Sequence, residues 1–208
     1  MRGGGDIAWS RAAGAVGIAL VLLAASAAAA SAGPSPFRHD LHRIDGRLRM
    51  AIEYGPAELG EGLIASEAVC RAAERAEGRG DGDQAAADRS VLSQLVEEVD
   101  RPTAGRIDSA FRRADSGLRA LRDRYSSAWS DPAKLRQLRR GVAGARVGIR
   151  MMRAAMERVE GSFDAWQANR CRDARRAIDG GAAKLPAGVE QVNRGMLRLW
   201  ELAFPQRR

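Results

Sequence analysis

An unbroken heptad pattern in the second half of the chain constrains the fold more than any other feature. Apolar side chains recur there at alternating steps of three and four residues, as they do along the seam of a coiled coil. Asp131 is a favourable N-cap, Pro132 suits the first helical position, and Gly180-Gly181 should end the helix. The pattern predicts one helix over residues 132–179, about 70 Å long at 1.5 Å per residue. The seam consists of Leu135, Leu138, Val142, Ala145, Ile149, Met152, Met156, Val159, Phe163 and Trp166.

A second seam precedes the first and has the same alternating spacing. Its members are Ile107, Phe111, Ala114, Leu118, Leu121, Tyr125 and Ala128. Because the connection between the two helices, residues 129–131, is short, we expect two antiparallel neighbouring helices. Pairing residues whose numbers add up to 263 matches every seam layer. The flanking positions then give the facing pairs Asp115 with Arg146, Asp108 with Arg153, and Gly117 with Gly148.

The rest of the chain is also helical in pattern, and strand signals are missing. A first long helix carries a seam from Leu41 to Ala73 and is broken at Gly55-Pro56. The second helix extends back to about Asp83 with Pro102 as an interior kink or a local restart, and Pro186 opens a short last helix. The sequence therefore predicts an all-α fold, an elongated antiparallel bundle of three long helices plus a short C-terminal fourth helix.

Residues 1–32 have the three parts of a cleavable secretory signal peptide. Two arginines supply positive charge, residues 15–30 are uncharged, and Ala30-Ser31-Ala32 offers a cleavage site. The alternative is an uncleaved membrane anchor, which needs about 20 strongly apolar residues, whereas much of this run is alanine. We expect residues 33–208 to form a single helical-bundle domain, secreted or periplasmic, with no stable transmembrane span after cleavage.

Cys70 and Cys171 are the only cysteines of the chain. An even count in an oxidising compartment indicates one disulfide. If the first turn is centred near residue 80, Cys70 and Ser90 lie at the same height on opposite sides of that turn. The pairing rule for the second turn, in which residue numbers add up to 263, then places Ser90 at the height of Asp173. The two cysteines then lie at nearly the same height. We predict a bond between the first and third long helices, with Cα atoms within about 7 Å.

Charge is unevenly distributed along the chain, whose formal net charge is +8. Residues 53–100 hold twelve acidic side chains against four arginines, whereas residues 101–208 hold 24 basic against 11 acidic side chains. Arginines on adjacent positions of the predicted third helix form one ridge that could bind an anionic partner. The members of this arginine ridge are Arg136, Arg139, Arg146, Arg150 and Arg153. The alternative is a solvated face that neighbouring acidic helices partly neutralise.

Two further groups of side chains could bind a ligand. Four aromatic residues should converge where the short helix folds back on the third helix, either as core or as an apolar-ligand pocket. They are Phe163, Trp166, Trp200 and Phe204. His39 and His42 have a spacing that can place two imidazoles on one helical face for a divalent metal. A complete site needs three or four ligands, so a solvated face is the alternative.

Catalytic motifs are missing from the sequence. Its serines lack a Ser/His/Asp context, and it contains neither HExxH nor a phosphate-binding glycine loop. We expect a non-enzymatic protein without a cofactor, an extracytoplasmic binding or scaffold protein that acts through a helix face. Its partner would be a protein or an anionic surface, either an envelope polymer or lipid. Nucleic acid is disfavoured, because no aromatic side chains interleave the arginines. The alternative function is a small-ligand or metal-binding bundle that uses the four aromatic residues or the two histidines.

Overall fold

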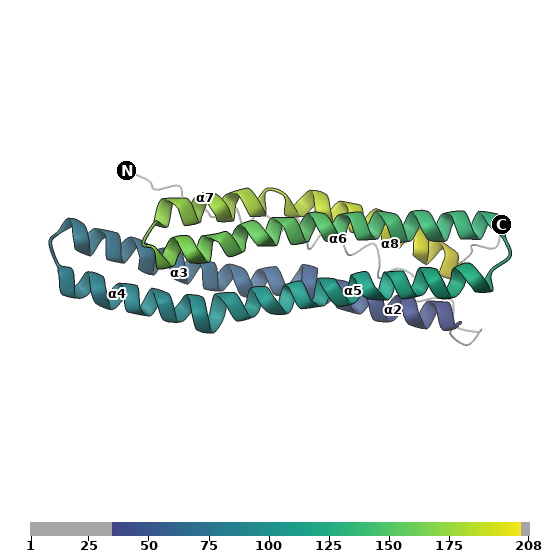
Figure 1. Ribbon diagram of the computed structural model, residues 1–208, viewed down its shortest axis with the longest axis horizontal. Helices are drawn as coiled ribbons and strands as arrows, with labels where there is room; N and C mark the ends of the chain where they lie inside the picture. The colour runs from purple at the N-terminus through teal and green to yellow at the C-terminus, as the bar shows by residue number, and fades with distance from the viewer. Residues whose placement is uncertain (1–34, 205–208) are drawn as a thin grey trace.

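The structure is a computed structural model that describes residues 35–204. The expected signal peptide, residues 1–32, lies outside the described part of the chain. The described helices run side by side along one long axis (Figure 1). Three of them are long and the C-terminal one is shorter, so the predicted all-α antiparallel bundle is confirmed. Their buried apolar side chains form one continuous core along the length of the bundle.

The first two long helices each contain a π-helical segment. The first is built from α2 (Pro36–Arg49), η2 (Met50–Tyr54) and α3 (Gly55–Gly78). The second is built from α4 (Gly82–Leu95), η3 (Val96–Asp100) and α5 (Arg101–Ala128). The turn between them is capped by Asp81, whose side chain accepts a hydrogen bond from the backbone nitrogen of Gln84 at 3.1 Å.

Both π-helical segments lie directly before a proline-containing turn. A proline ring clashes with the carbonyl group four residues earlier. For Pro56 and Pro102 these are the carbonyls of Ile52 and Glu98, which lie in the widened turns η2 and η3. The two predicted breaks therefore widen the helices locally without ending them.

The third helix, α6 (Pro132–Gln167), begins where the sequence predicts. The Asp131 side chain accepts a hydrogen bond from the backbone nitrogen of Ala133 at 2.8 Å. The predicted register against α5 is confirmed by two ion pairs. They join Arg146 Nε to Asp115 Oδ1 at 2.7 Å and Arg153 Nε to Asp108 Oδ1 at 2.6 Å.

The end of this helix was predicted wrongly, because α6 stops at Gln167 and not at residue 179. Asn169 has a positive φ of 54°, and its backbone nitrogen donates to the Trp166 carbonyl at 2.8 Å. The backbone nitrogen of Arg170 donates to the Ala165 carbonyl at 2.8 Å. These two bonds form a Schellman motif with asparagine in the left-handed position, which ends a helix and reverses the chain.

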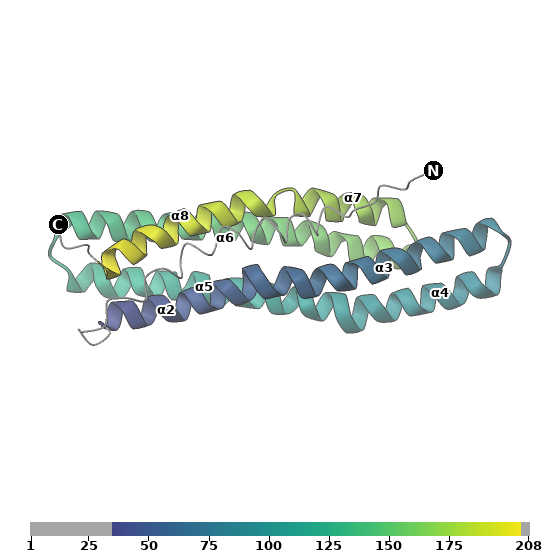
Figure 2. The same ribbon diagram turned by 180° about the vertical axis from the view of Figure 1, so that it is seen from behind.

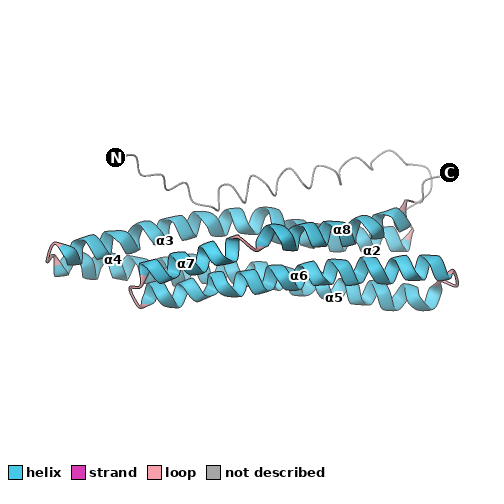
Figure 3. Cartoon of the chain, turned by 90° about the horizontal axis from the view of Figure 1, so that it is seen from above, coloured by secondary structure: helices cyan, strands magenta, loops and turns pink. Residues whose placement is uncertain are grey.

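The chain then returns along α6 as α7 (Cys171–Ala182) and α8 (Leu185–Ala203). Figure 3 shows the short loop that separates these two helices beside α6. Gly148 lies against the backbone of α8, where an added Cβ would be 2.5 Å from the nitrogen of Val192. Gly117 instead faces Ile44 of α2. The predicted pairing of Gly117 with Gly148 is therefore wrong, and the close approach that these glycines permit occurs between other helices.

Candidate anion-binding surfaces

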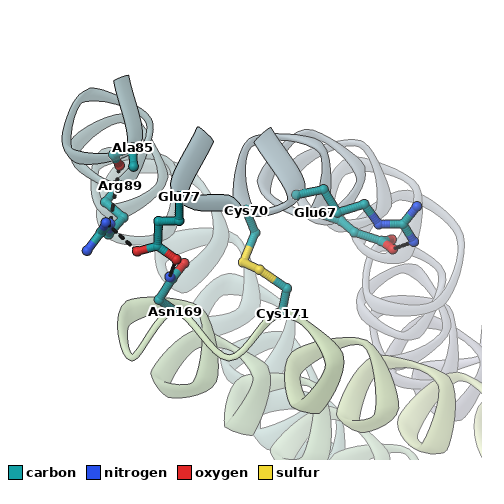
Figure 4. The surroundings of a disulfide bond; sticks show 8 residues. Glu67, Cys70, Glu77, Ala85, Arg89, Asn169 and Cys171 are labelled. Carbon is teal, nitrogen blue, oxygen red and sulfur yellow. Dashed lines mark hydrogen bonds and ion pairs between the residues drawn. A yellow bond between two sulfur atoms is a disulfide. The ribbon is translucent and has the colours of Figure 1, made fainter. Parts of the chain in front are cut away.

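The predicted cysteine pair lies at bonding distance. The sulfur atoms of Cys70 and Cys171 are 1.93 Å apart and the Cα atoms 5.9 Å apart, within the predicted limit (Figure 4). Since Cys171 opens α7, the bond joins α3 to the fourth helix and not to the third. Beside it, Glu77 of α3 accepts a hydrogen bond from Asn169 Nδ2 at 3.1 Å and forms an ion pair with Arg89. These contacts fasten the reversing turn to the first two helices.

The structure divides the arginine ridge into two groups. Arg146 and Arg153 are half-buried and bound to aspartates of α5. Arg136, Arg139 and Arg150 are exposed and form no ion pair within the described residues. The ridge therefore presents three uncompensated guanidinium groups to solvent.

The paired arginines act on the pKa values of their neighbours. Burial raises the pKa of Asp115, but hydrogen bonds from Arg146 and Arg119 outweigh burial, so its pKa lies below the ordinary value. A hydrogen bond to Asp108 raises the pKa of Arg153. The two ion pairs join α5 to α6.

A second basic surface, which we did not predict, lies along the contact between α2 and α5. Figure 2 shows these two helices side by side. Two adjoining hollows of about 440 and 450 Å³ make up this α2–α5 groove. Its acidic lining residues are Asp40 and Glu58. Its basic lining residues are Arg43, Arg47, Arg106, Arg112, Arg113 and Arg124. Six arginines against two carboxylates make the groove strongly cationic.

The four predicted aromatic residues do not converge. Phe163 and Trp166 lie near the end of α6, with ring centroids 6.3 Å apart. Trp200 and Phe204 form another pair, 5.7 Å apart, near the start of α6, where the adjacent Leu199 packs against Gly141. The chain reversal at Asn169 sends α8 back towards that end, so the predicted apolar-ligand pocket does not form.

The two histidines stay apart from any metal-binding cluster. His42 packs edge-on against Trp200, with ring centroids 4.7 Å apart, and His39 is exposed. The nearby carboxylate of Asp45 is bound to Arg49 Nε at 3.0 Å. Within residues 35–204, no group of three His, Cys, Asp or Glu side chains could hold a metal ion. The histidine pair thus lacks the further ligands that a metal site requires.

The sequence did not predict a buried carboxyl group that lies in η3. Asp100 is fully buried and accepts a hydrogen bond from Ser66 Oγ at 2.7 Å, while its other oxygen has no partner among the described residues. Burial raises the pKa of Asp100 to about 6, although the hydrogen bond from Ser66 lowers it. Asp100 also fills the space beside Gly62, where an added Cβ would be 2.2 Å from Oδ1.

The charged surfaces belong to a molecule without a membrane-spanning helix in its described part, since none of those helices is both long and apolar enough. Comparison of the chain with protein families, with curated proteins and with solved structures finds no match.

Proposed function

We propose that this protein is an extracytoplasmic, non-enzymatic binding or scaffold protein that engages an anionic partner through its arginine-rich half. The proposal is carried by the three exposed ridge arginines, Arg136, Arg139 and Arg150, which have no acidic partner within the described residues. Guanidinium groups left open to solvent on one helix face can bind phosphate, sulfate or carboxylate groups.

The distribution of charge along the bundle supports the same proposal. Residues 53–100, which hold twelve acidic side chains against four arginines, form α3, α4 and η3 at one end of the molecule (Figure 1). The ridge and the α2–α5 groove lie in the other half. An elongated molecule with opposite charge at its two ends presents its basic half to an anionic partner, and its acidic end disfavours the opposite orientation.

The cysteine pair supports placement outside the cytoplasm, because disulfides persist in oxidising compartments. The signal peptide expected over residues 1–32 points to the same location. A scaffold in such a compartment gains from a covalent link between distant parts of its chain.

Charge reversal on the ridge tests the proposal. The triple variant Arg136→Glu, Arg139→Glu, Arg150→Glu should weaken the salt-sensitive retention of the protein on heparin and on anionic vesicles. The matched control reverses Arg79, Arg158 and Arg172, which are equally exposed and lack ion pairs among the described residues. Retention of the ridge variant at the wild-type level would refute the role of the ridge. An equal loss of retention in the control variant would show that retention depends only on the net charge of the protein.

A further inference from the structure

The α2–α5 groove is long and continuous. Its two hollows share Arg43, Arg47 and Arg113, so they meet at these side chains. The lining extends along the first long helix from Asp40 to Glu58, about 27 Å at 1.5 Å per residue. A site of this length is too large for one phosphate ion.

Most arginines of the groove already have a carboxylate partner. Asp40 binds Arg43 at 2.7 Å and Arg124 at 2.6 Å, Glu58 forms an ion pair with Arg106, and Asp108 binds Arg112 at 2.6 Å. These partners account for four of the six arginines.

Arg47 and Arg113 are the exception, at the place where the two hollows meet. Arg47 Nη1 reaches across to the backbone carbonyl of Arg113 at 3.4 Å, and Arg113 Nη1 donates to Ser109 Oγ at 2.8 Å. Neither guanidinium group has a carboxylate partner among the described residues. Each wall of the groove thus carries one guanidinium group without a carboxylate partner, Arg47 on α2 and Arg113 on α5, and both line the two hollows.

Phosphate is the anion that unpaired arginines of this kind bind best. The guanidinium group offers a planar fork of donors that matches a phosphate in a bidentate manner, and two forks from facing helices can hold one phosphate from both sides. The floor beneath is apolar and includes Ile44, Ile107 and Leu121. Short aliphatic or polyol spacers between phosphate groups can lie on such a floor.

We infer that the α2–α5 groove binds a linear polymer of phosphodiester groups separated by short spacers, with Arg47 and Arg113 clamping one phosphate. A planar lipid surface would contact only the outermost side chains of α2 and α5 and would not reach the apolar floor of the groove between them. A nucleic acid strand needs stacking partners for its bases, and Tyr54 is the one aromatic side chain among the described residues that line the groove. The inference rests on the proposed function and adds a second binding surface with a ligand of its own.

Binding of the mature protein to poly(glycerol phosphate) tests the clamp. Arg47→Gln with Arg113→Gln should weaken binding at least tenfold at fixed salt. It should also reduce the slope of log affinity against log salt concentration by about 1, since the contacts to one phosphate are lost. The melting temperature should stay unchanged, because both side chains are exposed. Arg47→Lys with Arg113→Lys keeps the charge but loses the fork, and it should bind with intermediate affinity.

The matched control is Arg158→Gln with Arg172→Gln, which removes the same charge from two exposed arginines that lack ion pairs among the described residues and do not line the groove. An equal loss of binding in this control, or full binding by the clamp variant, would overturn the inference. Vesicles of phosphatidylglycerol carry the same phosphate chemistry on a planar surface, and a single-stranded oligonucleotide carries it on a strand with bases. If the wild type prefers either of these and the clamp variant loses that binding, the assigned polymer is wrong.

The ridge variant separates this inference from the proposed function. The triple substitution of Arg136, Arg139 and Arg150 should leave binding of poly(glycerol phosphate) intact. If the polymer depends on the ridge and not on the clamp, the proposed function stands while the groove assignment fails. If neither variant affects any anionic probe, both fail.

Discussion

Removal of the bond between Cys70 and Cys171 should lower the stability of the bundle strongly without unfolding its helices. The two cysteines are 101 residues apart in sequence, and in the chain-entropy account a loop of that length contributes at most about 4.7 kcal/mol. Unfolding a domain of about 170 residues has an entropy near 0.36 kcal/mol per kelvin. The melting temperature should therefore fall by up to about 13 °C. Helicity should persist at 25 °C, since α7 still packs along α6.

Circular dichroism at 222 nm with and without a reductant measures this shift in protein from its native compartment. The variant Cys70→Ala with Cys171→Ala is the control. Its melting temperature should be close to that of the reduced wild type and should not change when the reductant is added. An unchanged wild-type melting temperature on reduction would refute the reasoning. So would two free thiols titrated under denaturing, non-reducing conditions.

Three further outcomes are expected. Gly195→Ala should destabilise the protein by about 1–3 kcal/mol, since its Cβ would lie 2.2 Å from the Ala145 backbone nitrogen. Gly180→Ala meets open space and should be neutral or stabilise by up to about 1 kcal/mol; equal effects in urea denaturation would contradict the packing of α8 on α6. Because burial raises the pKa of Asp100 to about 6, the folded state takes up a proton below pH 6 that the unfolded state binds only near pH 4. Ionised Asp100 thus costs stability at neutral pH, as much as about 3 kcal/mol, and the cost disappears as pH falls from 6 to 4. Asp100→Asn should gain more stability over wild type at pH 7.5 than at pH 4.5, and a difference that is the same at both pH values would disprove the burial of this carboxyl group. Intact mass of exported protein should place its N-terminus near Gly33, whereas recovery of Met1 in membranes would contradict signal cleavage.

The start and register of the long helices could be predicted because they follow local rules. Asp131 and Pro132 mark a helix start by side-chain capping and by fixed φ. The pairs of Asp115 with Arg146 and Asp108 with Arg153 follow from one short turn and a seam of constant period. Such features depend on neighbours in sequence or on one antiparallel contact.

The chain reversal at Asn169 could not be read from periodicity. Beyond it, Cys171, Ala174 and Ile178 still recur at helical spacing, because α7 also buries one stripe against the bundle. Only the single left-handed asparagine marks the turn. The wrong convergence of the four aromatic residues and the wrong partner of Gly148 both follow from this one error.

The predicted proximity of the two cysteines is correct although the end of α6 was predicted wrongly, and the reason is geometric. Cys171 follows the reversal directly, so its height along the bundle is nearly the same whether the chain continues or turns back. The α2–α5 groove, by contrast, was within reach of the same reasoning. A first turn centred near residue 80 sets Arg47 opposite Arg113 as well as Cys70 opposite Ser90.

The bond between α3 and α7 also closes residues 70–171, about half of the chain, into a covalent ring. Three of the connections between helices lie inside this ring, at residues 79–81, 129–131 and 168–170, and exposed turns of this kind are where proteases cut first. A single cut in any of them would leave both pieces attached through the sulfur atoms and held in place by the core. Within residues 35–204, the loop between α7 and α8 is the one connection outside the ring, so a cut there would be the only one to release a helix.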